Sequence, residues 1–400
     1  GGLVGSEMCI RDSTYGVHRV LESVLSARYP DRSFEVINTG MPAINSHVVR
    51  RIASDIQPLD ADAVILYMGN NEVVGPYGPA ATQPAWSVGA RNPALHLAAR
   101  ATRTGQLLDG WVSRKKNANQ SPTRWRGMEM FVNQPLAFEA PALEQVYEQL
   151  EENTRAIINK VRSQGSTMVV CSVATALRSP PFGSLHRSDL SDEDLKQWDK
   201  LFGLGLEKSQ AGDYHGAIES FRRAQELDGR MADLHYQLAR CYHAKGEPGV
   251  EQQYLEHARD LDPLRFRADS RINSILLEVG ASADAVVDTA KELVALPGEK
   301  PLFYDHVHFT HHGHYRLALL FADALAEAFP GNPQPDRTEE EVASDIGFTP
   351  WDGLRVWYEM HGRFNKAPFN QQFGHQARLE GMAGMLRTRA SALTPEVLFS

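Results

Sequence analysis

Asp305 and His308 are the pair of side chains in this sequence whose types and spacing most directly suggest chemistry. An aspartate three residues before a histidine, at the start of a predicted helix, has the spacing that lets a carboxylate orient an imidazole as a general base. Such a base needs a nucleophile to deprotonate, and donors for the charge that develops on the substrate. The other polar segments are therefore candidates for those two roles.

Two further polar segments follow predicted strands. Asn38 to Ala43 follows a β-type run at 34–38, and Gly69 to Glu72 follows a continuously apolar run at 63–68. In an open α/β sheet, functional sites gather at the edge where the carboxyl ends of the strands meet. We therefore expect these two segments and Asp305 to His308 to lie at one edge of a sheet.

The elements that must position these segments alternate between helix and strand. Apolar residues recur with helical spacing over 17–25, 48–56, 143–161 and 317–325, whereas short β-type runs cover 34–38, 63–68, 167–172 and 285–288. Pro30 ends the first helix, and Ser46 is predicted to cap the second. This alternation predicts a doubly wound α/β layer structure with a parallel sheet.

Residues 201–263 break the alternation and contain an internal repeat. A shift of 34 residues superposes Gly205 on Ala239, Gly212 on Gly246, Ala224 on Ala258 and Gly229 on Pro263. Small residues at these positions let the two helices of a hairpin approach closely, so the segment resembles a pair of tetratricopeptide repeats. Two mismatches weaken the repeat: Glu251 falls on Ala217, and Tyr242 falls on Lys208. Two copies are fewer than usually stand alone, so we expect the pair to pack on the α/β domain; a plain helical insertion is the alternative.

The predicted organisation is a leader at 1–13, two parts of an α/β domain at 14–200 and 264–330, a helical insertion between them at 201–263, and a linker with a helical C-terminal extension at 331–400. Within the first part, 75–141 is predicted to leave the sheet, with a helix near 95–111. Residues 126–131 are a candidate pocket lining, although surface loop packing is the preferred interpretation. The sequence does not reveal the role of the C-terminal helices.

Taken in order, the polar segments resemble the motif blocks of the SGNH (GDSL-type) hydrolases, over about 15–200 and 265–329. Gly69-x-Asn71-Glu72 matches the G-x-N-D block, Asn38-x-Gly40 opens the N-x-G-x-x-G block, and Asp305-x-x-His308 matches the D-x-x-H block. The resemblance implies a flavodoxin-like three-layer α/β/α sandwich and serine-dependent ester hydrolysis. It also implies that His308 is the general base and that Asp305 orients it.

The same resemblance implies two oxyanion donors, the side-chain amide of Asn71 and the backbone N–H of Ala43. The chain departs from the family at two positions, since Glu72 replaces an aspartate and Ala43 replaces the last glycine of its block. A backbone donor survives the second change. Any backbone angle that glycine alone adopts easily becomes doubtful.

The nucleophile block of the family, G-D-S after the first strand, has no clear match. Ser13 lies two residues before Tyr15, too close to a helix to end a strand and form a turn, whereas Ser6 has the better distance. Both serines lie in Gly1 to Ser13, a segment that resembles a translated sequencing adapter. We therefore assign neither, and expect that the native first strand and serine are missing and that this chain is inactive even if its parent is an enzyme. If residues 3–6 fill the empty strand position, we interpret that as geometry without common ancestry.

Composition argues against several functional classes. The net charge of -9 argues against a general nucleic-acid surface, and the three cysteines form no CxxC pair that would indicate disulfides or a zinc knuckle. No apolar run is long enough to predict a transmembrane helix. A membrane anchor or targeting signal would lie in the missing N-terminus, so the localisation stays open.

A metal site is the rival interpretation of the histidine-rich segment. Five histidines fall within nine residues: His306, His308, His311, His312 and His314. They span a loop and a helix start, without an HExxH pattern and without a second ligand cluster elsewhere in the chain. We therefore predict neither a metal nor a cofactor.

The sequence supports two functional hypotheses. The first is a hydrolase that cleaves a carboxylic ester, acyl or acetyl, of a small molecule or glycan through a Ser-His-Asp mechanism. The alternative is a protein-interaction module, in which the tetratricopeptide-like helices bind a protein partner and the α/β domain is an inactive scaffold.

Overall fold

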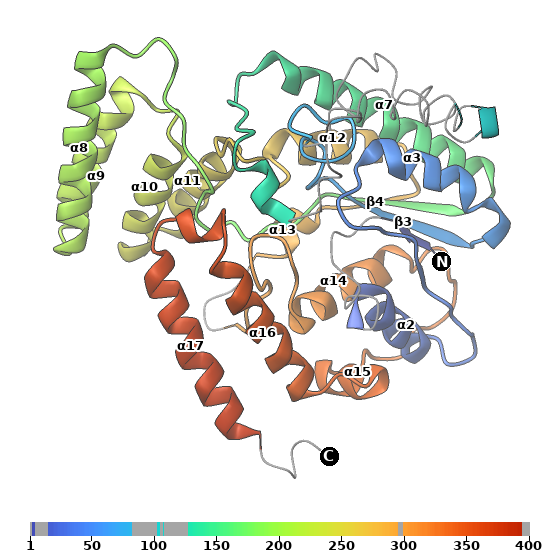
Figure 1. Cartoon of the computed structure of the whole chain (residues 1–400). Helices are drawn as coiled ribbons and strands as arrows, with labels where there is room; N and C mark the ends of the chain where they lie inside the picture. The colour runs from blue at the N-terminus through green and yellow to red at the C-terminus, as the bar shows by residue number, and fades with distance from the viewer. Residues whose placement is uncertain are drawn as a thin grey trace.

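A parallel sheet forms the centre of the molecule in the computed structural model, which describes residues 2–4, 15–81, 102–104, 107, 127–294 and 299–393 (Figure 1). The strands run in the order β2-β1-β3-β4-β5. Their bounds are β1(Gly2–Val4), β2(Ile37–Asn38), β3(Ala63–Tyr67), β4(Thr167–Cys171) and β5(Ala285–Val287). The prediction of an α/β architecture with a parallel sheet is confirmed.

The two longest strands show why this sequence forms a covered sheet. Every residue of β3 is buried, and β4 is buried from its second residue onward. The two strands pair in register from Ala63 opposite Thr167 to Tyr67 opposite Cys171. Continuous runs of β-branched and other apolar residues are stable there because helices cover both faces.

Strand β1 occupies the first-strand position of the sheet, between β2 and β3. Leu3 pairs with Asn38 of β2 on one side and with Ile65 of β3 on the other. A gap at this position would leave the facing edges of β2 and β3 with unpaired backbone groups, which a short extended segment satisfies. Residues 2–4 thus fill the first-strand position, and the prediction that the native first strand is missing stays a prediction. Ser6 and Ser13 lie outside the described residues.

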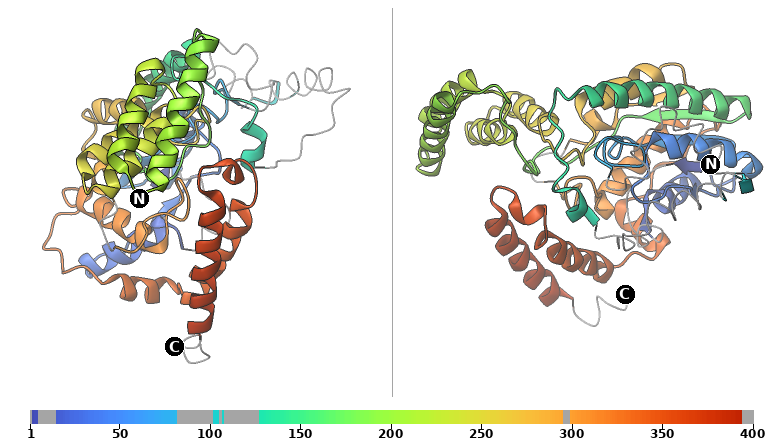
Figure 2. Two further views of the ribbon diagram at one scale, coloured as in Figure 1. Left: turned by 90° about the vertical axis from the view of Figure 1, so that its left-hand side faces the viewer. Right: turned by 45° about the horizontal axis from the view of Figure 1, so that its top comes forward.

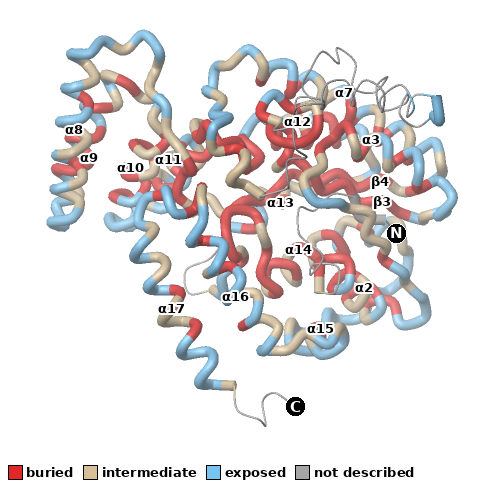
Figure 3. Tube along the Cα trace, viewed as in Figure 1, coloured by how far each residue is buried: buried red, intermediate tan, exposed pale blue. Residues whose placement is uncertain are grey.

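Helices cover the two faces of the sheet (Figures 1 and 2). One face carries α3(Ser46–Asp55), α7(Pro141–Ser163) and α12(Ser270–Gly280), and the other carries α2(Val17–Arg28) and α14(His311–Ala324). Their apolar stripes point inward, so the buried segments in Figure 3 concentrate between these helices and the strands. The predicted helices at 17–25, 48–56, 143–161 and 317–325 are confirmed.

The predicted insertion consists of two helical hairpins, α8(Asp192–Gln210) with α9(Tyr214–Leu227) and α10(Ala232–Ala244) with α11(Pro248–Asp260). Close packing explains the small residues of the repeat: a Cβ added at Gly205 would lie 2.4 Å from the Phe221 ring. Ala224, Ala239 and Ala258 are buried at the matching positions. Helix α8 begins at Asp192, ahead of the predicted boundary at 201.

The second hairpin is tied to the α/β domain through the mismatched residue Glu251. Its carboxylate is buried and lies 2.8 Å from the guanidinium of Arg178, which belongs to the segment after β4. The hydroxyl of Tyr236 on α10 donates to the backbone oxygen of the same arginine at 3.2 Å. The glutamate at the position of Ala217 in the first copy thus forms an ion pair with the α/β domain. This contact agrees with the predicted packing of the repeats on that domain.

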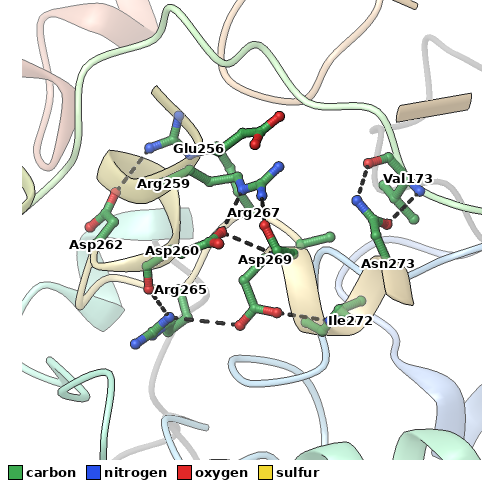
Figure 4. Close-up of polar contacts among 12 residues, drawn as sticks. Val173, Glu256, Arg259, Asp260, Asp262, Arg265, Arg267, Asp269, Ile272 and Asn273 are labelled. Atoms are coloured by element: carbon green, nitrogen blue, oxygen red, sulfur yellow. Dashed lines mark hydrogen bonds and ion pairs between the residues drawn. The ribbon is translucent and has the colours of Figure 1, made fainter. Parts of the chain in front are cut away.

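A buried charge cluster joins the end of the repeats to α12 (Figure 4). Arg267 and Asp262 are 3.3 Å apart and almost fully buried. Asp262 also accepts the backbone N–H of Phe182 at 2.8 Å. Asp269 caps α12 by accepting the N–H of Ile272, and the hydroxyl of Tyr147 on α7 donates to it at 2.6 Å. The cluster fixes the chain where it re-enters the α/β domain.

The C-terminal extension is helical, as predicted, with α15(Glu339–Ile346), α16(Pro350–Phe364), the short 3-10 helix η3(Phe369–Gln371) and α17(His375–Ala392). Gln372 donates to the backbone oxygen of Pro180 at 2.6 Å, which ties the extension to the segment after β4. Most of the predicted excursion at 75–141, including the helix near 95–111, lies outside the described residues. Among the helices that the structure describes, none combines the length and apolar character needed to cross a membrane.

Candidate active site

The Asp305 to His308 loop brings its carboxylate and imidazole into direct contact. His308 Nδ1 and Asp305 Oδ2 are 2.6 Å apart. The backbone fixes this arrangement, because Asp305 Oδ1 accepts the N–H groups of Val307 and His308 and the N–H of Tyr304 donates to the His308 carbonyl. An aspartate that accepts neighbouring backbone N–H groups closes a tight turn, which is why three-residue spacing suffices to form the pair.

The surroundings of Asp305 favour the ionised form of its carboxyl group. Burial opposes its ionisation, but the positive charge and hydrogen bonds of His308 and His306 hold its pKa well below the usual value. An ionised partner on Nδ1 orients the ring and stabilises the imidazolium form, which a general base needs.

Asn71 lies on the same cavity as His308, at the end of β3. Its side chain is 7% exposed, and its Nδ2 finds no hydrogen-bond acceptor among the described residues. Neighbouring bonds hold the loop in place, since Asn70 Oδ1 accepts the N–H of Ala268 and the Asn71 carbonyl accepts that of Gly75. Packing at Gly69 is close, because a Cβ there would lie 3.0 Å from the Val173 side chain. A buried, unpaired amide beside a cavity is suited to a ligand oxygen.

Ala43 lines the same cavity and has a φ of 60°, in the left-handed region that glycine favours. The backbone of Ala43 therefore adopts an angle that glycine favours, although alanine carries a Cβ. An L-residue in this region is strained by about 1–2 kcal/mol. The backbone N–H is unchanged in kind by the substitution.

Glu72 links the two segments that carry Asn71 and Ala43. It is fully buried, and the backbone N–H and hydroxyl of Ser46 donate to its two oxygens at 2.9 and 2.7 Å. Ser46 is therefore not the N-cap that the sequence predicts; Asn45 is, and Ser46 is the first residue of α3. Asn153 of α7 completes the link by donating to the Ser46 hydroxyl at 3.0 Å.

The cavity has a volume of about 530 Å³ and collects residues that sequence reasoning missed. Four residues of the 3-10 helix at 127–131 line it, namely Gly127, Met128, Glu129 and Phe131, so the pocket-lining alternative holds for these residues and the preferred interpretation as surface packing is wrong. The other missed lining residues come from the C-terminal extension: Glu359, Gly362, Arg363, Lys366, Ala367 and Phe369. Neither segment carries a motif, so no signal in the sequence marked them.

The structure separates the five clustered histidines. His312 pairs with Glu299 and Glu339, His311 stacks on Phe348, and His314 Nδ1 lies 3.3 Å from the Tyr15 carbonyl. A shared metal site for all five is therefore excluded by their geometry.

A smaller group of possible ligands remains, because one ligand atom each from Asp305, His306 and His308 lies within 4.8 Å of the others. The contacts of this group favour an acid–base pair over a cation site. Asp305 Oδ2 already faces His308 Nδ1, and the guanidinium of Arg363 lies 4.0 Å from the same oxygen. A nearby positive charge disfavours binding of a cation.

Comparison with known proteins supports one of these features. A family model described as tetratricopeptide repeat matches residues 201–230, the first copy of the internal repeat. No match is found among the curated proteins or among the solved structures. The chain thus contains a tetratricopeptide repeat, which suggests a protein-interaction module, and the comparisons do not support the resemblance to SGNH hydrolases.

Proposed function

We propose that the α/β domain is that of an SGNH-type hydrolase that cleaves carboxylic esters. The observation that carries the proposal is that His308, which contacts Asp305 at 2.6 Å, shares one cavity with Asn71 and Ala43, although these residues lie far apart in the sequence. The order β2-β1-β3-β4-β5 supports it further, because this is the order of flavodoxin-like doubly wound sheets.

In the proposed reaction each of these residues has a separate role. A serine oxygen from outside the described residues attacks the ester carbonyl carbon while His308 takes the serine proton, with Asp305 on Nδ1 stabilising the imidazolium. The Asn71 amide and the Ala43 N–H donate to the oxyanion, each worth roughly 2.7–4 kcal/mol of barrier. His308 then gives the proton to the leaving alcohol oxygen as the C–O bond breaks. Water releases the acid from the acyl-serine by the same steps, with His308 again as base.

The test is hydrolysis of p-nitrophenyl acetate by the protein expressed from its genomic sequence, including the part that encodes the residues before Tyr15. We expect His308→Ala to abolish the activity, while His312→Ala, at a histidine that pairs with Glu299 and Glu339 and does not line this cavity, retains it. Equal rates for the unmodified protein and His308→Ala would refute the proposal.

A second candidate function is favoured by the family match at 201–230. In this proposal the repeat helices bind a protein partner, and the α/β domain serves as a scaffold without activity. The genomic sequence that encodes the residues before Tyr15 separates the two candidates. A strand followed by Gly-x-Ser supports the hydrolase, and its absence supports the scaffold.

A further inference from the structure

We infer that the cavity beside His308 binds the acyl part of an ester as an extended apolar chain, longer than acetyl, and that residues 127–131 and the C-terminal extension determine this preference. The inference rests on the proposed function, because it names the substrate class of the same site. Its evidence lies in how the polar and apolar residues are distributed along the cavity wall.

The buried part of the wall is apolar and largely aromatic. Apart from Asn71 and His306, the lining residues that are less than 9% exposed are Val74, Phe131, Phe266 and Phe369. Three charged lining residues of the C-terminal extension are exposed, namely Glu359 and Arg363 on α16 and Lys366 just after it, whereas Glu129 is half-buried. Apart from Glu129 and the Arg363 guanidinium, which lies 4.0 Å from Asp305 Oδ2, the charged side chains lie on the exposed part of the wall, and the buried part offers a ligand mainly hydrophobic contact.

The aromatic wall is fixed by its own packing. Phe266 contacts Phe131 edge to face with ring centroids 5.8 Å apart, and Phe182 contacts both Phe266 and Phe369 at 5.2 Å. Phe364 of α16 packs on Phe369 at 4.8 Å. Because each ring is held by another, the wall does not collapse to fill the space, and the cavity of about 530 Å³ persists as a binding volume.

The position of the ester carbonyl decides what occupies this volume. A carbonyl oxygen at Asn71 Nδ2 and the Ala43 N–H would place the reacting carbon inside the cavity that His308 also lines. An acetyl group would then leave most of the aromatic wall uncovered, whereas each methylene added to an acyl chain would bury more of it. His308 delivers its proton to the leaving alcohol, which can reach the charged, exposed side of the cavity.

The test is binding of methyl esters of increasing acyl length, from methyl acetate to methyl octanoate, to the chain as it stands, by isothermal titration calorimetry. Burial of one methylene is worth about 0.8 kcal/mol, so the Kd should fall about fourfold for each one until the cavity is full. Butyl acetate, an isomer of methyl pentanoate with the chain on the alcohol side, should bind more weakly than methyl pentanoate. A Kd independent of acyl length, or tighter binding of butyl acetate, would overturn the inference.

Met128→Trp tests the assigned wall without removing a core residue, since Met128 is only half-buried and lines the cavity. We expect it to weaken binding of methyl octanoate at least tenfold and to leave methyl acetate unchanged. Met130→Trp, the same change two residues away and off the lining, should alter neither ligand. Equal effects of the two variants would overturn the assignment of this wall.

These measurements stay separate from the test of the proposed function because binding needs no nucleophile. Hydrolysis that depends on His308, combined with binding that ignores acyl length, overturns this inference alone. Binding that follows acyl length, without hydrolysis that depends on His308, overturns the proposed function alone.

Discussion

Glu72 offers a sharp test of the electrostatics beside the candidate site. Burial raises its pKa from 4.5 to about 7, against the opposing effect of the two hydrogen bonds from Ser46. In the unfolded chain the carboxyl is hydrated and titrates near its ordinary value. The folded protein therefore binds a proton at Glu72 more tightly than the unfolded chain does.

The sign of the effect follows from this difference. The contribution of Glu72 to the free energy of unfolding is fully present below about pH 4.5, where the carboxyl is protonated in both the folded and the unfolded chain. This contribution is lost as the pH rises through about 7, because the folded protein must then hold a buried charge. A pKa difference between 4.5 and about 7 corresponds to roughly 3 kcal/mol in the free energy of unfolding.

Glu72→Gln removes the titration and keeps the shape of the side chain. In urea unfolding at pH 5 to pH 8, the free energy of unfolding of the variant relative to the unmodified chain should rise with pH by up to about 3 kcal/mol. Glu152→Gln, an exposed change on α7, serves as the control and should show no such trend. A difference that stays constant over this range would refute the reasoning, because it would mean that Glu72 is not destabilised as a buried anion.

Three further predictions concern the backbone, the repeat junction and the dyad. Ala43→Gly should raise the free energy of unfolding by up to about 1 kcal/mol in urea, because it relieves the strained φ of 60°; a loss of stability would contradict the strain. Arg267→Met should lower that free energy by about 3–5 kcal/mol, since it leaves Asp262 buried without its partner, whereas Arg155→Ala on the exposed face of α7 should cost under about 1 kcal/mol; similar losses would count against a buried pair. With the natural serine present, Asp305→Asn should reduce kcat on the order of 10⁴-fold with little change in KM, and an unchanged kcat would remove Asp305 from the mechanism.

The spacing of apolar and small residues along the sequence predicted the structural features that depend mainly on residues close together in the chain. The helical stripes, the continuously apolar strand at 63–67 and the small residues of the repeat all follow from periodicity, and each corresponds to an element of the structure. The contact between Asp305 and His308 belongs to the same class, because a three-residue turn fixes it. The family match at 201–230 agrees with the repeat that internal comparison of the sequence predicts.

Errors at the level of single residues arose where a distant partner competed with a local rule. Ser46 has the side chain of an N-cap, but the buried carboxylate of Glu72 takes its hydroxyl. Glu251 breaks the repeat because Arg178 lies opposite it. An N-cap stabilises a helix by about 1 kcal/mol, whereas an unpaired buried charge costs more than that, so the contact with the buried carboxylate is favoured over the local rule.

The shape of the cavity was decided by tertiary structure alone. Phe369 and Met128 lie 241 positions apart in the sequence and carry no motif, yet both line the wall beside His308. Which side chains face a cavity depends on how helices and loops of different segments pack, and that packing is set by burial over the whole domain rather than by local period. The sequence by itself therefore determined the strands, the repeats and the acid–base pair, whereas the wall that would select a substrate exists only in the folded chain.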